Sequence, residues 1–440
     1  MKKVCVIGLW HLGLVSAACL AELGHDVVAA DPDEKLIADL KRGKLPLFEP
    51  GLEDLIQKMA GSARLHFENN LQTAVSGVKT VLITYDTPVD EKDQADLALF
   101  EKTMQTILPS LDRDAVLIIN SQVPVGSSEN WQRVIDEARP DGSIDLVYSP
   151  ENLRLGQALS LFKQPDMIVV GADTERAKSK AEEFYGVFPV EKIFVSRRTA
   201  EMAKHALNTF FATSISFANE IGNLCDAVGA DGFQVAQILK KDSRIGAKAQ
   251  VRPGLGFAGA TLARDIRALQ SLGKKTGTTT ALMDTVFEIN EKQTGRVVKI
   301  VEEYFEENLG DKTFTILGLT YKPGTSTLRR SVSIEIMKRL HAKGARIQAH
   351  DPKADLSEYR GEKFFQLNRD VYAACQGSHG ILVLTEWPEY QELDYGRIKK
   401  VMAGSFFLDA KNHLSEKKLE LLGFNYLQIG RGQLKERVKR

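Results

Sequence analysis

The sequence Val4-Cys5-Val6-Ile7-Gly8-Leu9-Trp10-His11-Leu12-Gly13 opens a pattern of strand, turn and helix. Its first four residues form a short apolar run that is typical of a buried parallel strand, and an apolar helix is expected over residues 12–23. Gly24 ends that helix, and residues 25–31 predict a second strand that closes on Asp31. This order of elements, within about 30 residues, is that of a dinucleotide-binding βαβ unit.

The rest of the chain predicts an α/β fold with two Rossmann-like doubly wound domains joined by a central helical domain. Residues 200–228 carry apolar residues at helical spacing without proline, which predicts a long buried helix. Gly318-Leu319 again follows a strand and marks a second strand and helix series. Further strands are expected over 80–83, 115–119, 145–148, 167–170, 314–317, 347–349, 380–384 and 405–408. We place domain boundaries at 1–195, 196–305 and 306–440.

Composition is that of a large globular protein without an obvious charged partner. The 440 residues include 58 basic and 58 acidic side chains, so the formal net charge is zero and no nucleic-acid or membrane-surface partner is expected. No apolar run approaches the roughly 20 residues of a membrane span, and a cytoplasmic location is expected. The four cysteines are scattered without metal-ligand spacing, so we expect buried thiols and no metal site. The basic residues 431–440 are expected to form a solvated tail.

Motifs along nearly the whole chain resemble those of the UDP-glucose/GDP-mannose dehydrogenase family. The segment Pro253–Asp265 is similar to the family's active-site sequence, roughly PGxGFGGSCxPKD. The other matching motifs, in chain order, are Leu45-Pro46 with Glu49-Pro50-Gly51-Leu52, Thr87-Pro88 with Ala95-Asp96-Leu97, Val123-Pro124-Val125-Gly126, Ser149-Pro150-Glu151-Asn152-Leu153-Arg154, Lys204 with Asn208, Gly318-Leu319 with Lys322-Pro323 and Arg329, Thr385-Glu386-Trp387, and Asp409-Ala410-Lys411-Asn412.

The resemblance implies an NAD-dependent enzyme that oxidises a UDP-sugar and forms a homodimer or higher homo-oligomer. The catalytic residues that it implies are Glu151, Lys204, Asn208, Thr261 and Asp265. The implied cofactor-binding residues are Gly8, Trp10, Leu12, Gly13, Asp31, Lys35, Thr87, Ser121 and Arg329. The implied substrate-binding residues are Asn152, Leu153, Arg154, Arg244, Gly256, Phe257, Gly259 and Lys322. In the family the lysine stabilises negative charge on the sugar oxygen, the acid orients a water or takes a proton, and the arginine comes from a neighbouring subunit.

Two departures from the family pattern affect the expected chemistry. Thr261 stands where the family has its nucleophilic cysteine, and a threonine hydroxyl is a poor nucleophile without a base beside it. Trp10 stands at the second glycine of GxGxxG, where a side chain would obstruct the approach of backbone amides to a pyrophosphate. Either the turn is rebuilt, or the cofactor sits differently, or none binds. Asp31 still favours NAD, because it can bond the ribose hydroxyls and would repel a 2′-phosphate. At His11 a solvated or packing histidine is expected.

Further losses fall in the same half of the family's reaction. Gln122 replaces a threonine and Leu155 replaces a glutamate, and both family residues handle water or the acyl-enzyme. The hypothesis is therefore a single two-electron oxidation of a hydroxyl on a UDP-sugar. One alternative is a full four-electron oxidation to a uronic acid without a covalent intermediate. Another is a non-catalytic protein that binds a nucleotide sugar.

Overall fold

The chain folds into two compact units, Met1–Leu207 and Asn208–Arg440. The structure is a computed structural model, and it describes residues 2–85, 87, 96–359 and 361–432. Pro88, Ala95 and residues 433–440 of the expected basic tail lie outside these described residues. The three predicted domain boundaries stay predictions.

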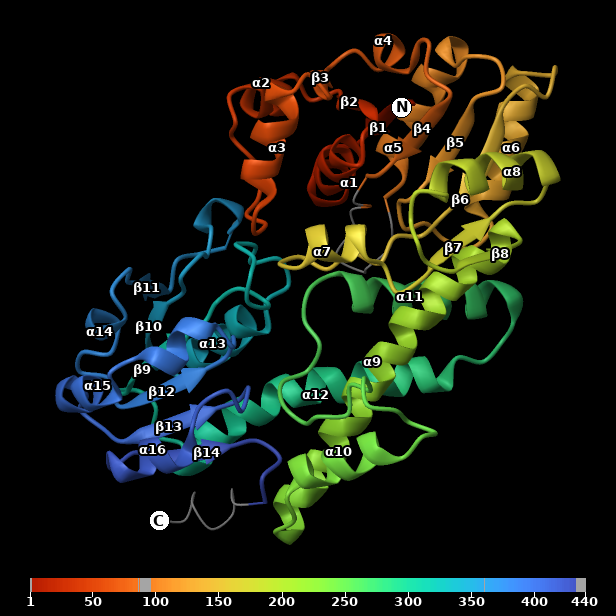
Figure 1. The fold of residues 1–440 in the computed structure, drawn as a ribbon. Coiled ribbons are helices and arrows are strands. Elements are labelled where there is room, and N and C mark those ends of the chain that lie inside the picture. Colours follow the sequence, from red (N-terminus) through yellow and green to blue (C-terminus); the bar gives the residue numbers. More distant parts are fainter. Residues whose placement is uncertain (1, 86, 88–95, 360, 433–440) are drawn as a thin grey trace. The chain divides into compact units, whose positions relative to one another are not determined.

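The first unit contains an eight-stranded sheet in the order β3-β2-β1-β4-β5-β6-β7-β8 (Figure 1). Its pairs are parallel except for β6 with β7, which run antiparallel. The strands are β1 Lys3–Ile7, β2 Asp26–Ala30, β3 Leu65–Glu68, β4 Thr80–Ile83, β5 Val116–Ile119, β6 Asp145–Tyr148, β7 Ile168–Gly171 and β8 Lys192–Val195. The helices are α1 His11–Glu22, α2 Glu34–Lys41, α3 Leu52–Gly61, α4 Leu71–Val75, α5 Ala98–Ile107, α6 Ser127–Ala138, α7 Ala158–Lys163 and α8 Glu175–Tyr185, with a 3-10 turn at Leu108–Ser110.

Side chains of β1 enter two cores, one on each face of the sheet. Val4 and Val6 pack in a cluster with α1, α3 and α8, whereas Cys5 and Ile7 pack in a cluster with α4, α5 and α6. Because successive side chains of a strand point to opposite faces, a strand covered by helices on both faces is apolar throughout. This confirms the doubly wound interpretation of the apolar run that opens the chain.

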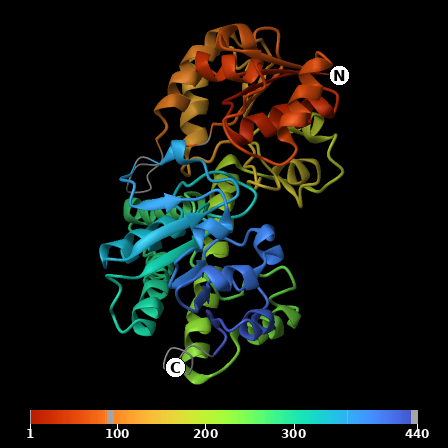
Figure 2. The ribbon, with the colours of Figure 1, turned by 90° about the vertical axis from the view of Figure 1, so that its left-hand side faces the viewer.

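The second unit contains a six-stranded, all-parallel sheet in the order β11-β10-β9-β12-β13-β14 (Figure 2). With β9 taken as the first strand, this is the order 3-2-1-4-5-6 of a dinucleotide-binding fold. The strands are β9 Thr313–Leu317, β10 Arg346–His350, β11 Phe365–Leu367, β12 Gly380–Val383, β13 Phe406–Asp409 and β14 Asn425–Gln428. The helices beside this sheet are α13 Val332–Ala342, α14 Val371–Ala374, α15 Tyr395–Val401 and α16 Glu416–Leu421, with 3-10 turns at Leu356–Glu358 and Pro388–Glu392.

Four helices lie between the two sheets in the sequence, and three of them share a small core within the second unit. Helix α9 spans Arg197–Val228 and passes from one unit into the other; α10 Gly232–Lys241, α11 Thr261–Thr276 and α12 Ala281–Tyr304 follow. Helices α9 and α12 cross in Figure 1, and the Ser216 hydroxyl donates to the Val286 carbonyl at the crossing. Ala212, Ile266 and Val286 are buried together there.

The prediction that residues 200–228 form a long buried helix is confirmed for the helix and wrong for the burial of part of its surface. The helix exists, but Phe210, Leu224 and Val228 are 75%, 58% and 77% exposed. Apolar spacing identified the helix correctly, yet the rest of this chain covers only part of its apolar surface.

Candidate functional site

The turn between β1 and α1 retains two of the three fingerprint glycines for steric reasons. Gly8 has φ +98°, and a Cβ there would lie 2.8 Å from Cδ1 of Tyr85. A Cβ on Gly13 would lie 1.8 Å from the carbonyl oxygen of Gly8. Both positions therefore require glycine if the helix is to start this close to the strand.

Trp10 stands at the second glycine position of the fingerprint, and its backbone φ angle is negative. It is the N-cap residue of α1, with φ −94° and ψ −138°, outside the left-handed region that favours glycine. The residue is half-buried, as is Leu12, and its ring makes an edge contact with His11. The negative φ of Trp10 therefore does not itself require glycine at the start of this helix.

Asp31, at the end of β2, is fixed by the turn and keeps room for a ligand. Its carboxylate accepts hydrogen bonds from the amides of Leu9 at 2.8 Å and Asp33 at 3.0 Å, and burial raises its pKa. Asp351 holds the corresponding position after β10. There the carboxylate accepts six hydrogen bonds, from the amides of Leu319, Thr320, Lys353 and Ala354, the Thr320 hydroxyl and the Trp387 indole.

This difference bears on which turn can hold a dinucleotide. Two oxygens offer about four lone-pair sites, so Asp31 retains acceptor capacity for ribose hydroxyls and Asp351 is saturated. The glycine turn, the N-terminus of α1 and Asp31 together fit NAD, and these features are present although Trp10 replaces the second glycine.

The other predicted cofactor residues are less uniform. Thr87 and Ser121 follow β4 and β5, at the same edge of the sheet as the turn, and their hydroxyls donate to the carbonyls of Gln122 and Ile83. Lys35 is exposed and bonded to Asp39 at 3.0 Å. Arg329 is exposed and belongs to the second unit. Thr87 and Ser121 lie where ligands of doubly wound sheets bind. The roles of all four residues stay predictions.

Lys204 is held by the loop that follows β6. Its ammonium donates to the Glu151 carbonyl and, at 2.8 Å, to Oδ1 of Asn152. Burial raises the pKa of Glu151 to about 7, although the nearby Lys204 charge opposes this. Leu153 packs on the core cluster that contains α1, and Arg154 is exposed. Lys204 of α9 therefore contacts the loop that carries a carboxyl group titrating near neutrality, which suits proton transfer.

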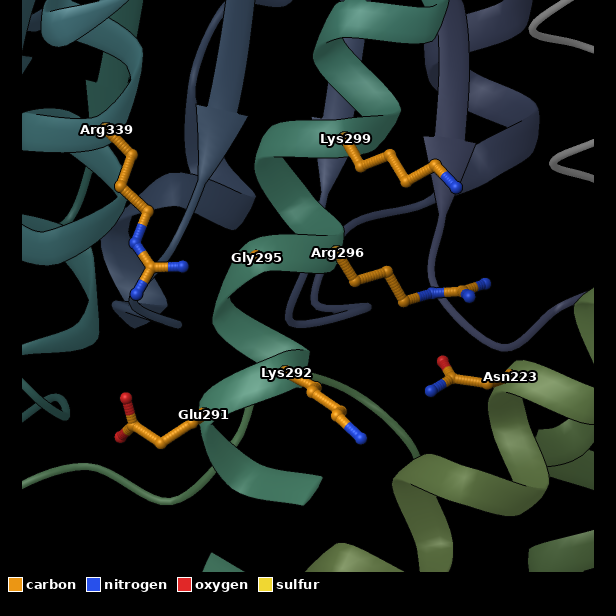
Figure 3. A pocket seen from close by; sticks show the side chains of 7 residues that line it. All are labelled: Asn223, Glu291, Lys292, Gly295, Arg296, Lys299 and Arg339. Atoms are coloured by element: carbon orange, nitrogen blue, oxygen red, sulfur yellow. The ribbon is translucent and has the colours of Figure 1, made fainter. Parts of the chain in front are cut away.

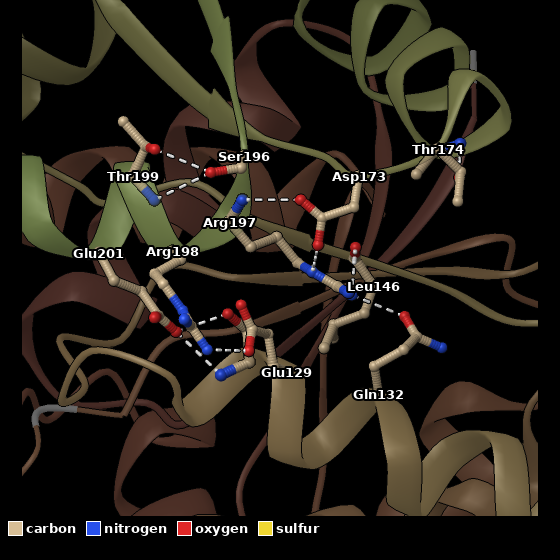
Figure 4. A network of polar contacts seen from close by, with 12 residues as sticks. Glu129, Gln132, Leu146, Asp173, Thr174, Ser196, Arg197, Arg198, Thr199 and Glu201 are labelled. Carbon is tan, nitrogen blue, oxygen red and sulfur yellow. Dashed lines mark hydrogen bonds and ion pairs between the residues drawn. The ribbon is translucent and has the colours of Figure 1, made fainter.

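The first turn of α9 is anchored just before Lys204 (Figure 4). Glu201 is fully buried and accepts hydrogen bonds from the amides of Gly126 and Ser128, at the start of α6. Arg197 donates to Asp173 at 2.7 Å and to Gln132 at 2.7 Å. These contacts fix the direction of α9, and hence of Lys204, within the first unit.

In the second unit, Thr261 is the first residue of α11 and its side chain is exposed. Asp265 lies one turn further along and is fully buried. Asn208 of α9 donates its Nδ2 to Oδ2 of Asp265 at 2.5 Å. Three of the predicted catalytic residues thus lie on two packed helices of one unit, and two of them are directly bonded.

Three amide side chains that the sequence did not single out shape the glycine loop before α11. Asn290 accepts from the amide of Phe257 at 2.6 Å and donates to its carbonyl at 3.1 Å. Asn219 and Gln293 bond the amide and the carbonyl of Gly254. A Cβ on Gly256 would lie 2.3 Å from Asn290 Oδ1. In the sequence these three residues could have been recognised as polar side chains within helix patterns that are otherwise apolar.

The remaining predicted substrate residues have contacts of other kinds. A Cβ on Gly259, which has φ +78°, would lie 3.2 Å from the Tyr321 ring. Lys322 is half-buried, with its ammonium 5.5 Å from the same ring. Arg244 is exposed and paired with Asp242. Their substrate roles stay predictions.

A pocket of about 580 Å³ beside α12 contains none of the predicted residues (Figure 3). Its lining residues are Asn223, Glu291, Lys292, Gly295, Arg296, Lys299 and Arg339. Each of the four cations has a carboxylate partner, in Glu288, Asp226, Glu303 and Glu335 respectively. The pocket is therefore electrically balanced, and we assign it no ligand.

Neither a membrane-spanning helix nor a cluster of metal-ligating side chains is present among the described residues. No helix among them is long and apolar enough to span a membrane. They contain no group of three or more histidine, cysteine or acidic side chains arranged to hold a metal ion. All four cysteines are buried free thiols, as expected.

Comparison with known proteins identifies the family. Residues 2–189, 198–292 and 315–416 match the NAD binding, central and UDP binding domains of the UDP-glucose/GDP-mannose dehydrogenase family. The chain is 36% identical over 434 residues to UDP-glucose 6-dehydrogenase TuaD of Bacillus subtilis, covering 98% of this chain and 94% of that protein. It is 34% identical to UDP-glucose 6-dehydrogenase of Rhizobium meliloti, covering 98% and 99%.

A solved structure agrees over the same length. The UDP-glucose dehydrogenase from Pyrobaculum islandicum superposes with a TM-score of 0.86 at 30% identity, covering 94% of this chain and 96% of that one. The match extends through both sheets and the helices between them. With its three domain matches, its relatives and its NAD binding turn, the chain belongs to the UDP-glucose/GDP-mannose dehydrogenase family.

Proposed function

We propose that this protein is an NAD-dependent UDP-sugar dehydrogenase that removes one hydride from a sugar hydroxyl and stops at the aldehyde or ketone. Thr261 carries the proposal, because it replaces the cysteine that the family's second oxidation uses. A threonine hydroxyl is not ionised near neutral pH and forms no thiohemiacetal. The covalent route from aldehyde to acid is therefore closed, while the residues expected for the first step are present.

The first oxidation needs a proton acceptor and a cation near the sugar oxygen. Glu151, with a pKa of about 7, can take the hydroxyl proton. Lys204 can stabilise negative charge as it develops on that oxygen. NAD, when bound, would accept the hydride. The Glu151 carbonyl and Asn152 hold the Lys204 ammonium in place through neutral oxygens.

Binding of a UDP-sugar is supported by the second unit. Asn219, Asn290 and Gln293 hold the glycine loop in place, so a ligand that binds there meets a preorganised surface. Lys322 supplies a nearby cation on the same unit. UDP is favoured over GDP because the relatives reported above are named UDP-glucose dehydrogenases and residues 315–416 match the UDP binding domain.

One observation favours a second candidate, a non-catalytic protein that binds a nucleotide sugar. Trp10 occupies the position where backbone amides would approach the pyrophosphate. If the indole excludes NAD, the fold remains but turnover does not. A four-electron oxidation without a covalent intermediate remains the alternative within catalysis.

A screen of UDP- and GDP-sugars, with and without NAD, tests these possibilities. Melting temperature reports binding, and absorbance of NADH reports turnover. We expect one UDP-sugar to raise the melting temperature and to yield NADH. If wild-type protein binds both a UDP-sugar and NAD yet reduces no NAD with any sugar, the dehydrogenase proposal is replaced by the binding one.

We also propose a homodimer formed through the exposed face of α9. Phe210, Phe217 and Leu224 recur every seven residues, with Ile221 and Val228 at the intervening spacing of four. This is the repeat with which two helices pack along a seam. Leu224→Glu should yield a monomer in sedimentation velocity. Leu421→Glu, at an 80% exposed position on α16, is the matched control and should leave the mass unchanged. An unchanged mass in Leu224→Glu would contradict a dimer formed through this face of α9.

A further inference from the structure

A buried pair, His11 and Glu49, joins the cofactor turn to the loop that holds Lys204. Nε2 of His11 lies 3.0 Å from Oε2 of Glu49, and the two residues are 7% and 3% exposed. His11 is the first residue of α1 and follows Trp10 directly, so it belongs to the turn that would receive a pyrophosphate. Glu49 is separated from it by 38 residues of sequence. The pair is therefore a tertiary contact between the turn and another segment of the first unit.

The Glu49 carboxylate has two further donors, and both lie in the loop after β6. The amide of Gly156 donates to Oε2 at 2.7 Å, and the amide of Ala158 donates to Oε1 at 2.8 Å. Ala158 is the first residue of α7 and is fully buried, so the carboxylate fixes the point at which the loop ends. Glu49 thus accepts three hydrogen bonds, and removal of one donor leaves a buried charge less well compensated.

The same loop contacts Lys204 at its other end. The Glu151 carbonyl and Oδ1 of Asn152 accept from the lysine ammonium. Only three residues separate Asn152 from Gly156, where the backbone turns through φ +85°. A displacement of Gly156 is therefore transmitted over one short segment to the oxygens that orient Lys204.

We propose that His11, acting through Glu49, is a positioning residue that couples the cofactor turn to the loop that orients Lys204. When the cofactor site is occupied, the turn and His11 become fixed, and the loop is fixed with them. By reciprocity, a UDP-sugar that orders the loop should strengthen dinucleotide binding. The inference rests on the proposed function, because it assumes that both ligands bind.

The first test measures the coupling itself. Binding of NADH, which cannot oxidise the sugar, is titrated with and without a saturating UDP-sugar from the screen, in wild type, His11→Met and His11→Gln. Methionine fills a similar volume and removes the donor, while the glutamine Nε2 restores one. Wild type should bind NADH at least about fivefold more tightly when the UDP-sugar is present, which is the lower end of typical couplings.

His11→Met should lose that enhancement, and His11→Gln should recover most of it. His25→Met is the matched control, because His25 is buried in the same unit before β2, at the opposite edge of the sheet from the turn. It should keep the full coupling. A purely structural role for His11 would weaken both ligands equally and leave the coupling unchanged, and that result overturns the proposal.

The second test needs no ligand. Hydrogen exchange of the amides of residues 151–158 should accelerate in His11→Met and not in His25→Met. Unchanged exchange in this loop overturns the proposal even if the enzyme turns over normally. If wild type shows neither NAD binding nor turnover while exchange responds as expected, the proposed function fails and the coupling falls with it, whereas the contact between turn and loop stands.

Discussion

Nδ2 of Asn208 donates a hydrogen bond to Oδ2 of Asp265 at 2.5 Å, and the carboxylate is fully buried. This contact joins α9 to α11 one turn after Thr261, the residue at which α11 begins. Two of the predicted catalytic residues, Asn208 and Asp265, are therefore directly bonded, one helical turn from Thr261. If a buried carboxylate loses a hydrogen-bond donor, that bond no longer offsets the free-energy cost of removing the carboxylate from water.

Asn208→Ala should accordingly destabilise the protein by about 2 kcal/mol, and the added change Asp265→Asn should recover part of that loss. Denaturant unfolding measures both free energies. Asn223→Ala is the control on the same helix, because its partner Gln293 is neutral, and it should cost about 1 kcal/mol or less. Equal losses for the two single variants would contradict a buried, charged Asp265.

The raised pKa of Glu151 predicts a pH dependence of catalysis. With its pKa raised to about 7 by burial, it accepts a proton only at higher pH, so kcat/KM should rise through about pH 7 and then level off. Glu151→Gln should lower kcat/KM and remove this inflection. A profile with the same inflection in the variant would assign it to another group.

The same pKa gives a prediction for stability. Glutamate in an unfolded chain has a pKa of about 4.3, so the folded state binds the proton more tightly. The stabilisation from this group is complete below that value and is lost as pH rises through about 7. Glu151→Gln should therefore gain melting temperature relative to wild type at about pH 8 and gain little at about pH 4. A constant difference across this range would contradict the raised pKa.

Trp10→Gly should tighten NAD binding. The backbone angles at this position suit glycine as well as tryptophan, so the main effect is to open the space in which amides approach the pyrophosphate. Isothermal titration with NAD measures the change, and Trp10→Phe should resemble wild type. Weaker binding in Trp10→Gly would show instead that the indole supports the cofactor.

Lys204→Ala should reduce turnover by about 10²-fold or more, because we propose that the lysine stabilises charge that develops in the transition state. Its affinity for the UDP-sugar should change little, since the proposed site of the diphosphate lies on the second unit. Steady-state kinetics and titration of the UDP-sugar separate the two effects. Lys178→Ala, on α8 of the same unit, should leave turnover unchanged. A loss of affinity alone in Lys204→Ala would support the non-catalytic alternative.

The sequence predicted the strands and helices well because both sheets are covered on two faces. Apolar runs such as residues 4–7 and 314–317 then stand out from their surroundings. Strands β3, β8, β11 and β14 were not predicted; β3 and β8 mix polar and half-buried residues, and such runs resemble loops. The exposed face of α9 was mistaken for core, because periodicity shows where apolar residues lie on a helix but not what covers them.

Site prediction depended on whether partners lie near one another in sequence. The glycines of the turn and Asp31 belong to one local unit, and the structure brings them together as the sequence pattern predicts, whereas their roles stay predictions. Glu49 was noticed only as part of a motif, since its partner His11 lies in another segment. Asn290 contacts Phe257 across 33 residues, so its role in shaping the glycine loop could not be predicted from either segment alone.

The stoichiometry of the reaction tests the central claim most directly. The UDP-sugar that the screen identifies is consumed to completion with excess NAD, NADH is counted, and a carbonyl reagent traps the product. Because Thr261 cannot form the covalent intermediate, we predict one NADH per sugar and a trapped aldehyde or ketone. Two NADH per sugar with a uronic acid product would contradict the claim.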